Sequence, residues 1–226
     1  MKNYWKKPRL AVALASLGFL SVVGTAQAAL FEIDFTTSGA FSGVAPGSPT
    51  PSTVFATAIF DDHGSPGSVT LTMNVLNNLS AGAYVNDWYF NVSSAPLSST
   101  PTFVSGVSAT TVDSGVDAFK PDGSGLYDFA FHFPTAAPGE LAQGNSSVYN
   151  LAGAGITASS FNSLSTAPAD PTHGPFISAI HVQGYGNSVW IAGEPGGRII
   201  EVPEPATLAL LGLGLFGIAA TRRRWG

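Results

Sequence analysis

Short stretches in which apolar and polar residues alternate recur along the middle of this chain, and they constrain its fold more than any other feature. In segment 69–75 every second residue is apolar and the others are Thr or Asn, and segment 126–133 alternates in the same way with Tyr and Phe. Successive side chains of a β-strand point to opposite faces. Each of these segments therefore predicts a strand with one buried face and one solvated face.

The segments that separate these stretches are rich in Gly, Pro, Ser and Thr. The chain of 226 residues has 26 Gly and 16 Pro, and charged residues make up only 10% of it. This composition favours strands and turns over surface helices. We predict an all-β domain over residues 29–193, an antiparallel β-sandwich or jelly roll of about eight to ten strands. One strand is expected near 155–160, and 36–53 is expected to be a loop.

The cations of the chain lie at its two ends. Between Ala29 and Val202, thirteen acidic residues stand against only Lys120 and Arg198, a formal charge of −11. A nucleic-acid partner is excluded, because phosphate binding needs a basic face. The chain has no cysteine, so a disulfide framework, a thiolate metal site and a cysteine nucleophile are excluded too.

The first 28 residues have the layout of a secretory signal peptide. A basic start precedes an apolar run from Leu10 to Gly24, and Ala26-Gln27-Ala28 follows. Signal peptidase requires small residues at the positions of Ala26 and Ala28, so we expect cleavage before Ala29 and export through the Sec translocon. An uncleaved membrane helix is the alternative, although the apolar run is short for a membrane span.

The last 25 residues contain three elements in a fixed order. Val202-Pro203-Glu204-Pro205 comes first, an apolar run over 208–220 comes next, and the basic cluster Arg222-Arg223-Arg224 comes last. Proline fixes φ and lacks a donor, so a helix is expected only after the motif, over about 206–221. Its apolar part is about 20 Å long, shorter than a ~30 Å hydrocarbon core. The basic cluster stays cytoplasmic by the positive-inside rule, which leaves the domain outside.

This order of Pro-Glu-Pro, short apolar helix and Arg cluster resembles the PEP-CTERM sorting signal, also known as the C-terminal domain of ice-binding proteins. The resemblance implies processing at Pro203-Glu204-Pro205 by an exosortase. It also implies a transient anchor in the inner membrane, followed by transfer to the cell surface or the extracellular matrix. Residues 194–201 are expected to be a flexible spacer before this signal, and a plain C-terminal tail anchor is the alternative.

Four aspartates suggest a metal site within the domain. They surround a Gly-rich segment and are Asp113, Asp117, Asp122 and Asp128. Carboxylate oxygens on such a loop suit Ca²⁺, although Asp in a turn commonly caps its own backbone and the spacing is not that of an EF-hand. Calcium is therefore a candidate ligand, and no other cofactor is expected.

No catalytic signature stands out in the sequence. The four histidines are scattered and there is no Gly-x-Ser-x-Gly elbow, so we expect no enzyme activity. The leading hypothesis is an exported surface or extracellular-matrix protein associated with exopolysaccharide or biofilm. One alternative is a carbohydrate-binding β-sandwich in which exposed aromatic side chains stack on sugar rings, with Trp88, Tyr185 and Trp190 as candidates.

A hydrolase of extracellular polymers is the other alternative. Such an enzyme needs two carboxylates placed in a cleft lined by aromatic side chains. Glu32, Asp34 and Asp87 are the acidic residues that could supply them, because Asp87 precedes Trp88 and Tyr89. Trp88, Tyr89 and Phe90 are consecutive, however, so at least one face of this strand is expected to pack into the core.

Overall fold

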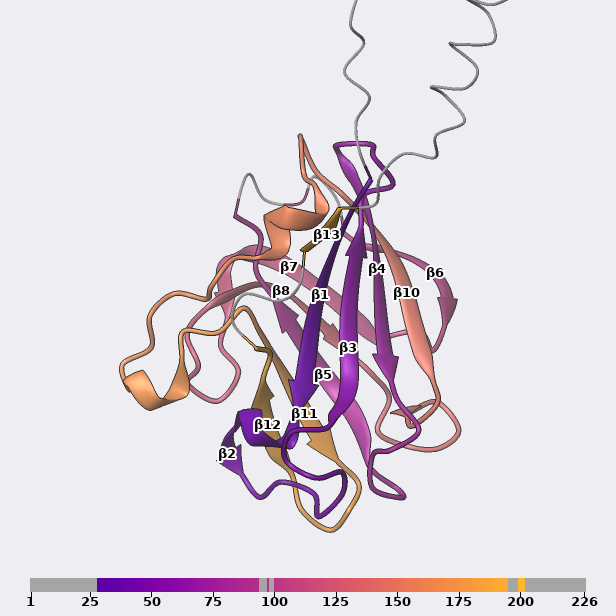
Figure 1. Cartoon of the computed structure of the whole chain (residues 1–226), viewed down its shortest axis with the longest axis vertical. Coiled ribbons are helices and arrows are strands. Elements are labelled where there is room, and N and C mark those ends of the chain that lie inside the picture. The colour runs from indigo at the N-terminus through magenta and orange to yellow at the C-terminus, as the bar shows by residue number, and fades with distance from the viewer. Residues whose placement is uncertain (1–27, 94–96, 98–99, 195–198, 202–226) are drawn as a thin grey trace, which may run out of the picture.

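The computed structural model describes residues 28–93, 97, 100–194 and 199–201, and these form thirteen β-strands and three short 3₁₀ helices. The strands make two sheets in which all pairings are antiparallel. Figure 1 shows one sheet in front of the other. The prediction of an all-β domain is confirmed, and the two layers fit the predicted sandwich.

Sheet A has six strands. In spatial order they are β13 (Ile199–Glu201), β1 (Ala29–Thr36), β3 (Val54–Asp61), β4 (Ser68–Val75), β10 (Ser146–Ala152) and β6 (Thr102–Gly106). Sheet B has seven strands. They are β2 (Ala40–Gly43), β12 (Val189–Ala192), β11 (Ser178–Gln183), β5 (Tyr84–Phe90), β8 (Tyr127–His132) and β7 (Thr111–Phe119), with β9 (Leu141–Ala142) paired to β5.

One aromatic core joins the two sheets. Phe35 of β1 meets Trp88 of β5 edge to face, with ring centroids 5.2 Å apart, and Phe60 of β3 meets Phe90 of β5 in the same way at 5.3 Å. Phe161, at the end of the 3₁₀ helix η2 (Ala158–Phe161), stacks on Phe60 at 4.2 Å. All five side chains are fully buried. These contacts fix which face of each sheet points outward.

Several elements differ from the sequence-based expectation. Segment 155–160 leads into η2 instead of forming a strand, because Thr157 and Ser160 make a capping box there. Strand β2 lies inside the segment expected to be a loop. Strand β7 is an exposed edge strand that is not predicted, because its charged and Gly residues do not alternate with apolar ones. Strand β13 pairs with β1 and so places the last part of the predicted spacer in sheet A.

The predictions for both ends of the chain lie largely outside the described residues. These are the signal peptide up to Gln27, the helix at 206–221, the motif Val202-Pro203-Glu204-Pro205 and the basic cluster Arg222-Arg223-Arg224. Within the part of the chain that the structure describes, no helix is long and apolar enough to cross a membrane.

Candidate functional site

The candidate site lies on the outer face of sheet B, the face that points away from the core. In β5 the side chains of Trp88 and Phe90 are buried in the core. Because successive side chains of a strand alternate, Asp87 and Tyr89 lie on the outer face. Both are partly exposed. The middle strand of the sheet thus presents a carboxylate and a phenol side by side.

The neighbouring strands place further side chains beside Asp87 on the outer face. Asp87 is the register partner of His132 in β8 and of His181 in β11. His181 is in turn the partner of Trp190 in β12. Side chains directly opposite each other in paired strands are close enough to interact. We call Asp87, His132, His181 and Trp190 the outer-face cluster.

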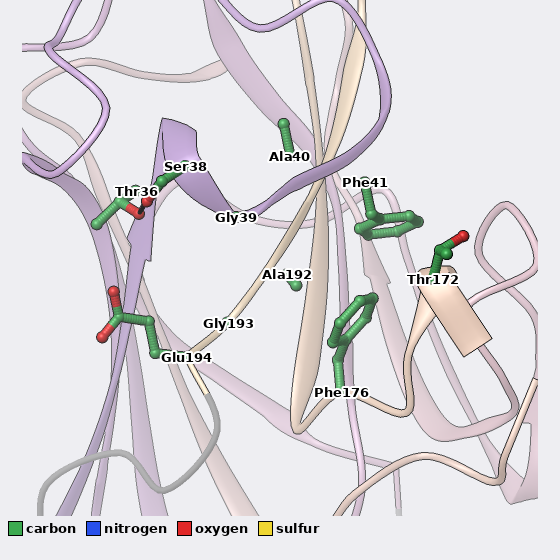
Figure 2. A pocket seen from close by; sticks show the side chains of 10 residues that line it. All are labelled: Thr36, Ser38, Gly39, Ala40, Phe41, Thr172, Phe176, Ala192, Gly193 and Glu194. Atoms are coloured by element: carbon green, nitrogen blue, oxygen red, sulfur yellow. Dashed lines mark hydrogen bonds between the residues drawn. The ribbon is translucent and has the colours of Figure 1, made fainter.

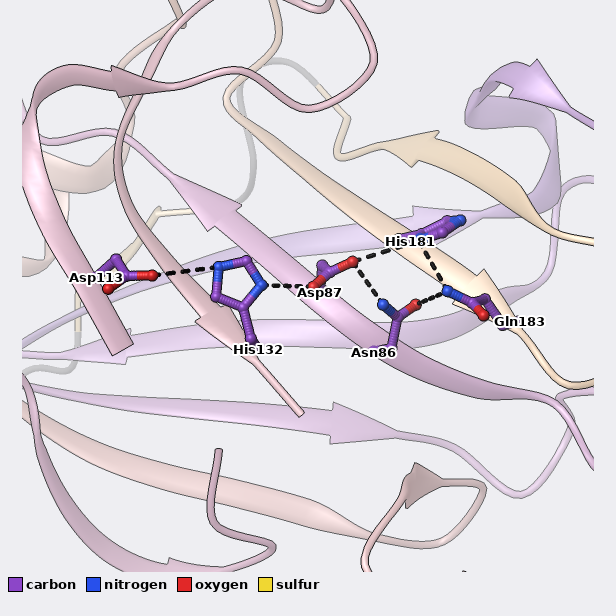
Figure 3. A network of polar contacts seen from close by, with 6 residues as sticks. All are labelled: Asn86, Asp87, Asp113, His132, His181 and Gln183. Carbon is purple, nitrogen blue, oxygen red and sulfur yellow. Dashed lines mark hydrogen bonds and ion pairs between the residues drawn. The ribbon is translucent and has the colours of Figure 1, made fainter. Parts of the chain in front are cut away.

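Asp87 is the centre of a polar network (Figure 3). Its Oδ1 lies 2.6 Å from Nδ1 of His132, and its Oδ2 lies 3.3 Å from Nδ1 of His181. Asn86 has no register partner in β11, where the register shifts. Its Nδ2 donates to Oδ2 of Asp87 at 2.5 Å, and its Oδ1 accepts from Nε2 of Gln183 at 2.9 Å. Both carboxylate oxygens of Asp87 are therefore occupied.

The two histidines set the charge of this network. Burial alone would raise the pKa of Asp87, but the hydrogen bonds from His132 and His181 outweigh it and lower the pKa to about 2. The hydrogen bond to Asp87 raises the pKa of His132, against the opposing effect of burial. Asp113 of β7, whose Oδ2 lies 3.5 Å from Nε2 of His132, adds to this rise. His132 is thus held between two carboxylates.

Aromatic rings lie along the network. The rings of His181 and Trp190 stack with centroids 4.3 Å apart and an interplanar angle of 5°. Tyr89 lies 5.8 Å from Trp190 and 5.9 Å from His132, measured between ring centroids. Burial raises the pKa of Tyr89, and the negative charges of Asp87 and Asp113 raise it further. Its hydroxyl therefore stays protonated over the physiological pH range.

A pocket of about 380 Å³ lies at the edge of sheet B formed by β2 and β12, where Thr36 of β1 also lines it (Figure 2). Ala192 in its wall follows Trp190 by two residues in β12, so both residues belong to the outer face. Phe41 of β2 and Phe176 line the pocket with ring centroids 5.1 Å apart, and Glu194 adds a carboxylate. The outer face therefore continues from the cluster towards an aromatic and acidic hollow.

The predicted sugar-stacking residues lie in three different environments. Trp88 is 0% exposed, because its side chain points from sheet B into the core. The prediction that Trp88 stacks on sugar rings is therefore wrong. Tyr185 lies in the turn between β11 and β12, partly buried, and its hydroxyl donates to the carbonyl of Val44. Trp190 is partly exposed on the outer face. Only Trp190 is thus part of the cluster.

The four aspartates predicted as a calcium site have separate roles. Asp128 accepts the backbone N–H groups of Val92 and Asp117, at 2.9 Å and 3.0 Å. Asp113 faces His132, and Asp122 has a φ of 37° in the turn after β7. Among the residues that the structure describes, no group of three or more His, Asp or Glu side chains could hold a metal ion. The side chain of Asp128 thus holds two backbone N–H groups and that of Asp113 faces a histidine, so the four do not converge on one site.

The carboxylates considered for a hydrolase do not share a cleft. Glu32 and Asp34 alternate with the buried Ile33 in β1 and so lie on the outer face of sheet A. Asp87 lies on the outer face of sheet B, with the core between the two faces. The separation follows from strand alternation, and it leaves Asp87 with histidines as its partners.

The pairing of Asp87 with two histidines is not evident from the sequence. His132 and His181 are 45 and 94 positions away from Asp87. The sequence does indicate that both histidines point outward, because His132 stands between two Phe residues and His181 between Ile and Val. A polar residue between buried neighbours in a strand points outward, but only the strand order shows which outward residues meet.

Comparison with known proteins identifies the C-terminal end of the chain. No curated protein and no solved structure matches the chain. Residues 201–224 match the family model described as the PEP-CTERM protein-sorting motif. The match confirms the resemblance and includes Pro203-Glu204-Pro205 and the basic cluster. This motif marks an exported protein that an exosortase processes on its way to the cell surface. The chain therefore carries a PEP-CTERM protein-sorting motif, and the match begins at the last residue of strand β13.

Proposed function

We propose that this protein is a non-enzymatic component of the cell surface or the extracellular matrix, and that its β domain binds exopolysaccharide through the outer-face cluster. The sorting motif supplies the export and the exosortase partner. The observation that carries the binding proposal is the stack of Trp190 on His181 beside the hydrogen-bonded carboxylate of Asp87.

A sugar ring has an apolar face of C–H groups and a rim of hydroxyls. His181 covers one face of the Trp190 ring, and the exposed part of the indole suits the apolar face of the sugar, as amphipathic aromatic groups do at other interfaces. Gln183, whose Nε2 contacts Asn86 and His181, offers its amide oxygen beside this ring. The arrangement thus provides apolar stacking and polar orientation within one sheet face.

The negative charge of the domain determines which class of polysaccharide it can bind. The domain carries a formal charge of −11 between residues 29 and 202, and both Asp87 and Asp113 belong to the network. An acidic polysaccharide would be repelled by this surface. We therefore propose a neutral polysaccharide as the ligand, with the adjacent pocket as a second contact for the chain.

The protonation state of the network supports binding rather than hydrolysis. A general acid works best with a pKa near the operating pH. With a pKa of about 2, Asp87 is a poor proton donor at neutral pH. Its oxygens are occupied by His132, His181 and Asn86. This arrangement suits a residue that positions its neighbours.

The binding proposal predicts that Trp190→Ala weakens binding to a neutral polysaccharide about tenfold, or about 1.4 kcal/mol. The alanine removes the exposed ring while the strand pairings remain. The measurement is a pull-down with polysaccharide from the native envelope, using protein with an unchanged circular dichroism spectrum. Phe103→Ala is the matched control, because Phe103 is 42% exposed on sheet A. Equal losses in both variants, or no binding by the folded wild type, would contradict the proposal.

The sorting motif predicts a defined C-terminus after export. Mass spectrometry of the protein from its native envelope is expected to find the last residue near Pro205, with Arg222, Arg223 and Arg224 removed. Replacing Pro203-Glu204-Pro205 by Ala-Gln-Ala is expected to retain the intact tail, whereas the substitution Thr207→Ala after the motif serves as control. An intact basic cluster in every wild-type molecule would make the tail a permanent anchor.

A further inference from the structure

Asp62 is a buried carboxylate that holds the first residue of β1. Its side chain is at the end of β3 and only 4% exposed. Oδ1 accepts the backbone N–H groups of Ala29 at 2.9 Å and Gly64 at 3.0 Å, and Oδ2 accepts that of Ala158 at 3.2 Å. The backbone N–H of Asp62 donates in return to the carbonyl of Ala29 at 3.3 Å. Ala29 is thus bound to Asp62 through both of its backbone polar groups.

This carboxylate has no cationic side chain as a partner. In the described part of the chain the ion pairs all involve histidine, and none of them includes Asp62. Burial would raise the pKa of Asp62, but its three backbone N–H donors, with a smaller effect of the neighbouring His63, outweigh burial and lower the pKa, so the group is charged at neutral pH. A buried charge without a counter-ion is costly. A positive charge on a group that already contacts Asp62 would therefore be stabilised there.

We propose that Asp62 is the binding site for the α-ammonium group that signal peptidase creates at Ala29. Cleavage hydrolyses the peptide bond between Ala28 and Ala29. Water supplies the hydroxyl of the new Ala28 carboxyl group and a proton to the Ala29 nitrogen, and the resulting amine takes up one further proton from solvent. The nitrogen that donates as a neutral amide in the precursor then becomes a cation beside the same carboxylate oxygen.

The new charge on the Ala29 nitrogen strengthens its existing contact with Asp62, and no atom has to move. The nitrogen of Ala29 already lies 2.9 Å from Oδ1 of Asp62, and hydrogen bonds between ionised partners are about twice as strong as neutral ones. Ala29 is also the register partner of Glu201 in β13. Signal-peptide removal would thus stabilise the strand end from which the sorting motif continues. This inference rests on the predicted cleavage point and is independent of carbohydrate binding.

Other titratable groups lie close to this site. Asp61 and His63 flank Asp62 and pair with each other, with Nδ1 of His63 3.1 Å from Oδ2 of Asp61. Glu201 occupies the register position opposite Ala29. Neither Asp61 nor His63 is hydrogen-bonded to the Ala29 nitrogen, which contacts Asp62. A substitution of Asp61 therefore changes a neighbouring carboxylate and leaves the Asp62 contact in place.

Amine labelling of the exported protein tests the proposal. Residues 29–226 contain a single lysine, Lys120, so the processed chain has only two primary amines and Lys120 serves as the internal reference. We expect mass spectrometry to find Ala29 as the first residue. Its amine is expected to titrate about one unit above the ordinary 7.7–8.0, so that acetylation at pH 7 is about tenfold slower than for a free α-amine.

Two variants isolate the role of Asp62. Asp62→Asn is expected to restore the ordinary labelling rate of the α-amine, whereas Asp61→Asn is expected to leave the slow rate unchanged. If Asp62→Asn does not fold, a glycine inserted between Ala28 and Ala29 gives a processed chain whose amine lies one residue away from Asp62, and its labelling should be fast. A first residue other than Ala29, or an ordinary rate in the wild type, would overturn the proposal.

Discussion

The substitution Trp88→Ala is expected to lower the free energy of unfolding by about 3–5 kcal/mol. The indole is 0% exposed and contacts the rings of Phe35 and Phe90 at centroid distances of 5.2 Å and 5.9 Å. Its Nε1 has no hydrogen-bond partner among the described residues, so the loss is one of packing. Since small domains are stable by about 5–15 kcal/mol, urea denaturation followed by circular dichroism should show a large shift of the midpoint.

Trp190→Ala is the matched control for this substitution. It removes the same side chain from the same sheet, but from the outer face, where the ring is partly exposed. Its effect on stability is expected to be under about 1.5 kcal/mol, the upper range for an aromatic pair. Equal effects of the two substitutions would show that Trp88 does not connect the two sheets as the structure indicates.

The substitution Asp87→Asn is expected to reduce the pH dependence of stability. The pKa of Asp87 falls from 3.8 to about 2 on folding, so its carboxylate stabilises the fold above pH 3.8 and loses this effect as the pH falls towards 2. The pKa of His132 is raised above 6.5, so its contribution is complete below pH 6.5 and is lost as the pH rises through the raised value. The wild type is therefore expected to be most stable between about pH 4 and 6.5.

The magnitude follows from the shift of Asp87. Its side chain is 15% exposed, and after allowance for solvent screening the pairs should contribute about 1–2 kcal/mol at pH 5. Urea midpoints measured from pH 2 to pH 9 give the profile. Asp113→Asn is the control, because Asp113 is 52% exposed and 3.5 Å from His132; it should keep the slope below pH 4. An unchanged profile in Asp87→Asn would contradict the described network.

The sequence predicts those strands in which apolar and polar residues alternate clearly. Segments 69–75 and 126–133 alternate because one face is buried, and the structure forms β4 and β8 there. Strand β7 escapes the prediction because an edge strand does not need a continuous buried face. The sorting motif is predicted most fully, since it is a sequence motif that depends only on the order of neighbouring residues.

The candidate site depends on the register between paired strands, which the residue pattern of a single strand does not predict. Trp88, Tyr89 and Phe90 are equally aromatic, and only the packing of sheet B decides that Tyr89 alone points outward. Asp87 meets His132 and His181 because β5 lies between β8 and β11. The same dependence on distant strands explains why Asp62, in a turn, is adjacent to Ala29.

The pairing of Ala29 with Glu201 places the entry and the exit of the domain at one point (Figure 1). A short turn that joined these two residues would make β13 and β1 an ordinary antiparallel hairpin, and the chain could then be opened at another exposed turn. The strand order of sheet A is thus compatible with circular permutation. For the same reason the domain could be inserted as one piece into a surface loop of another protein, with both junctions side by side.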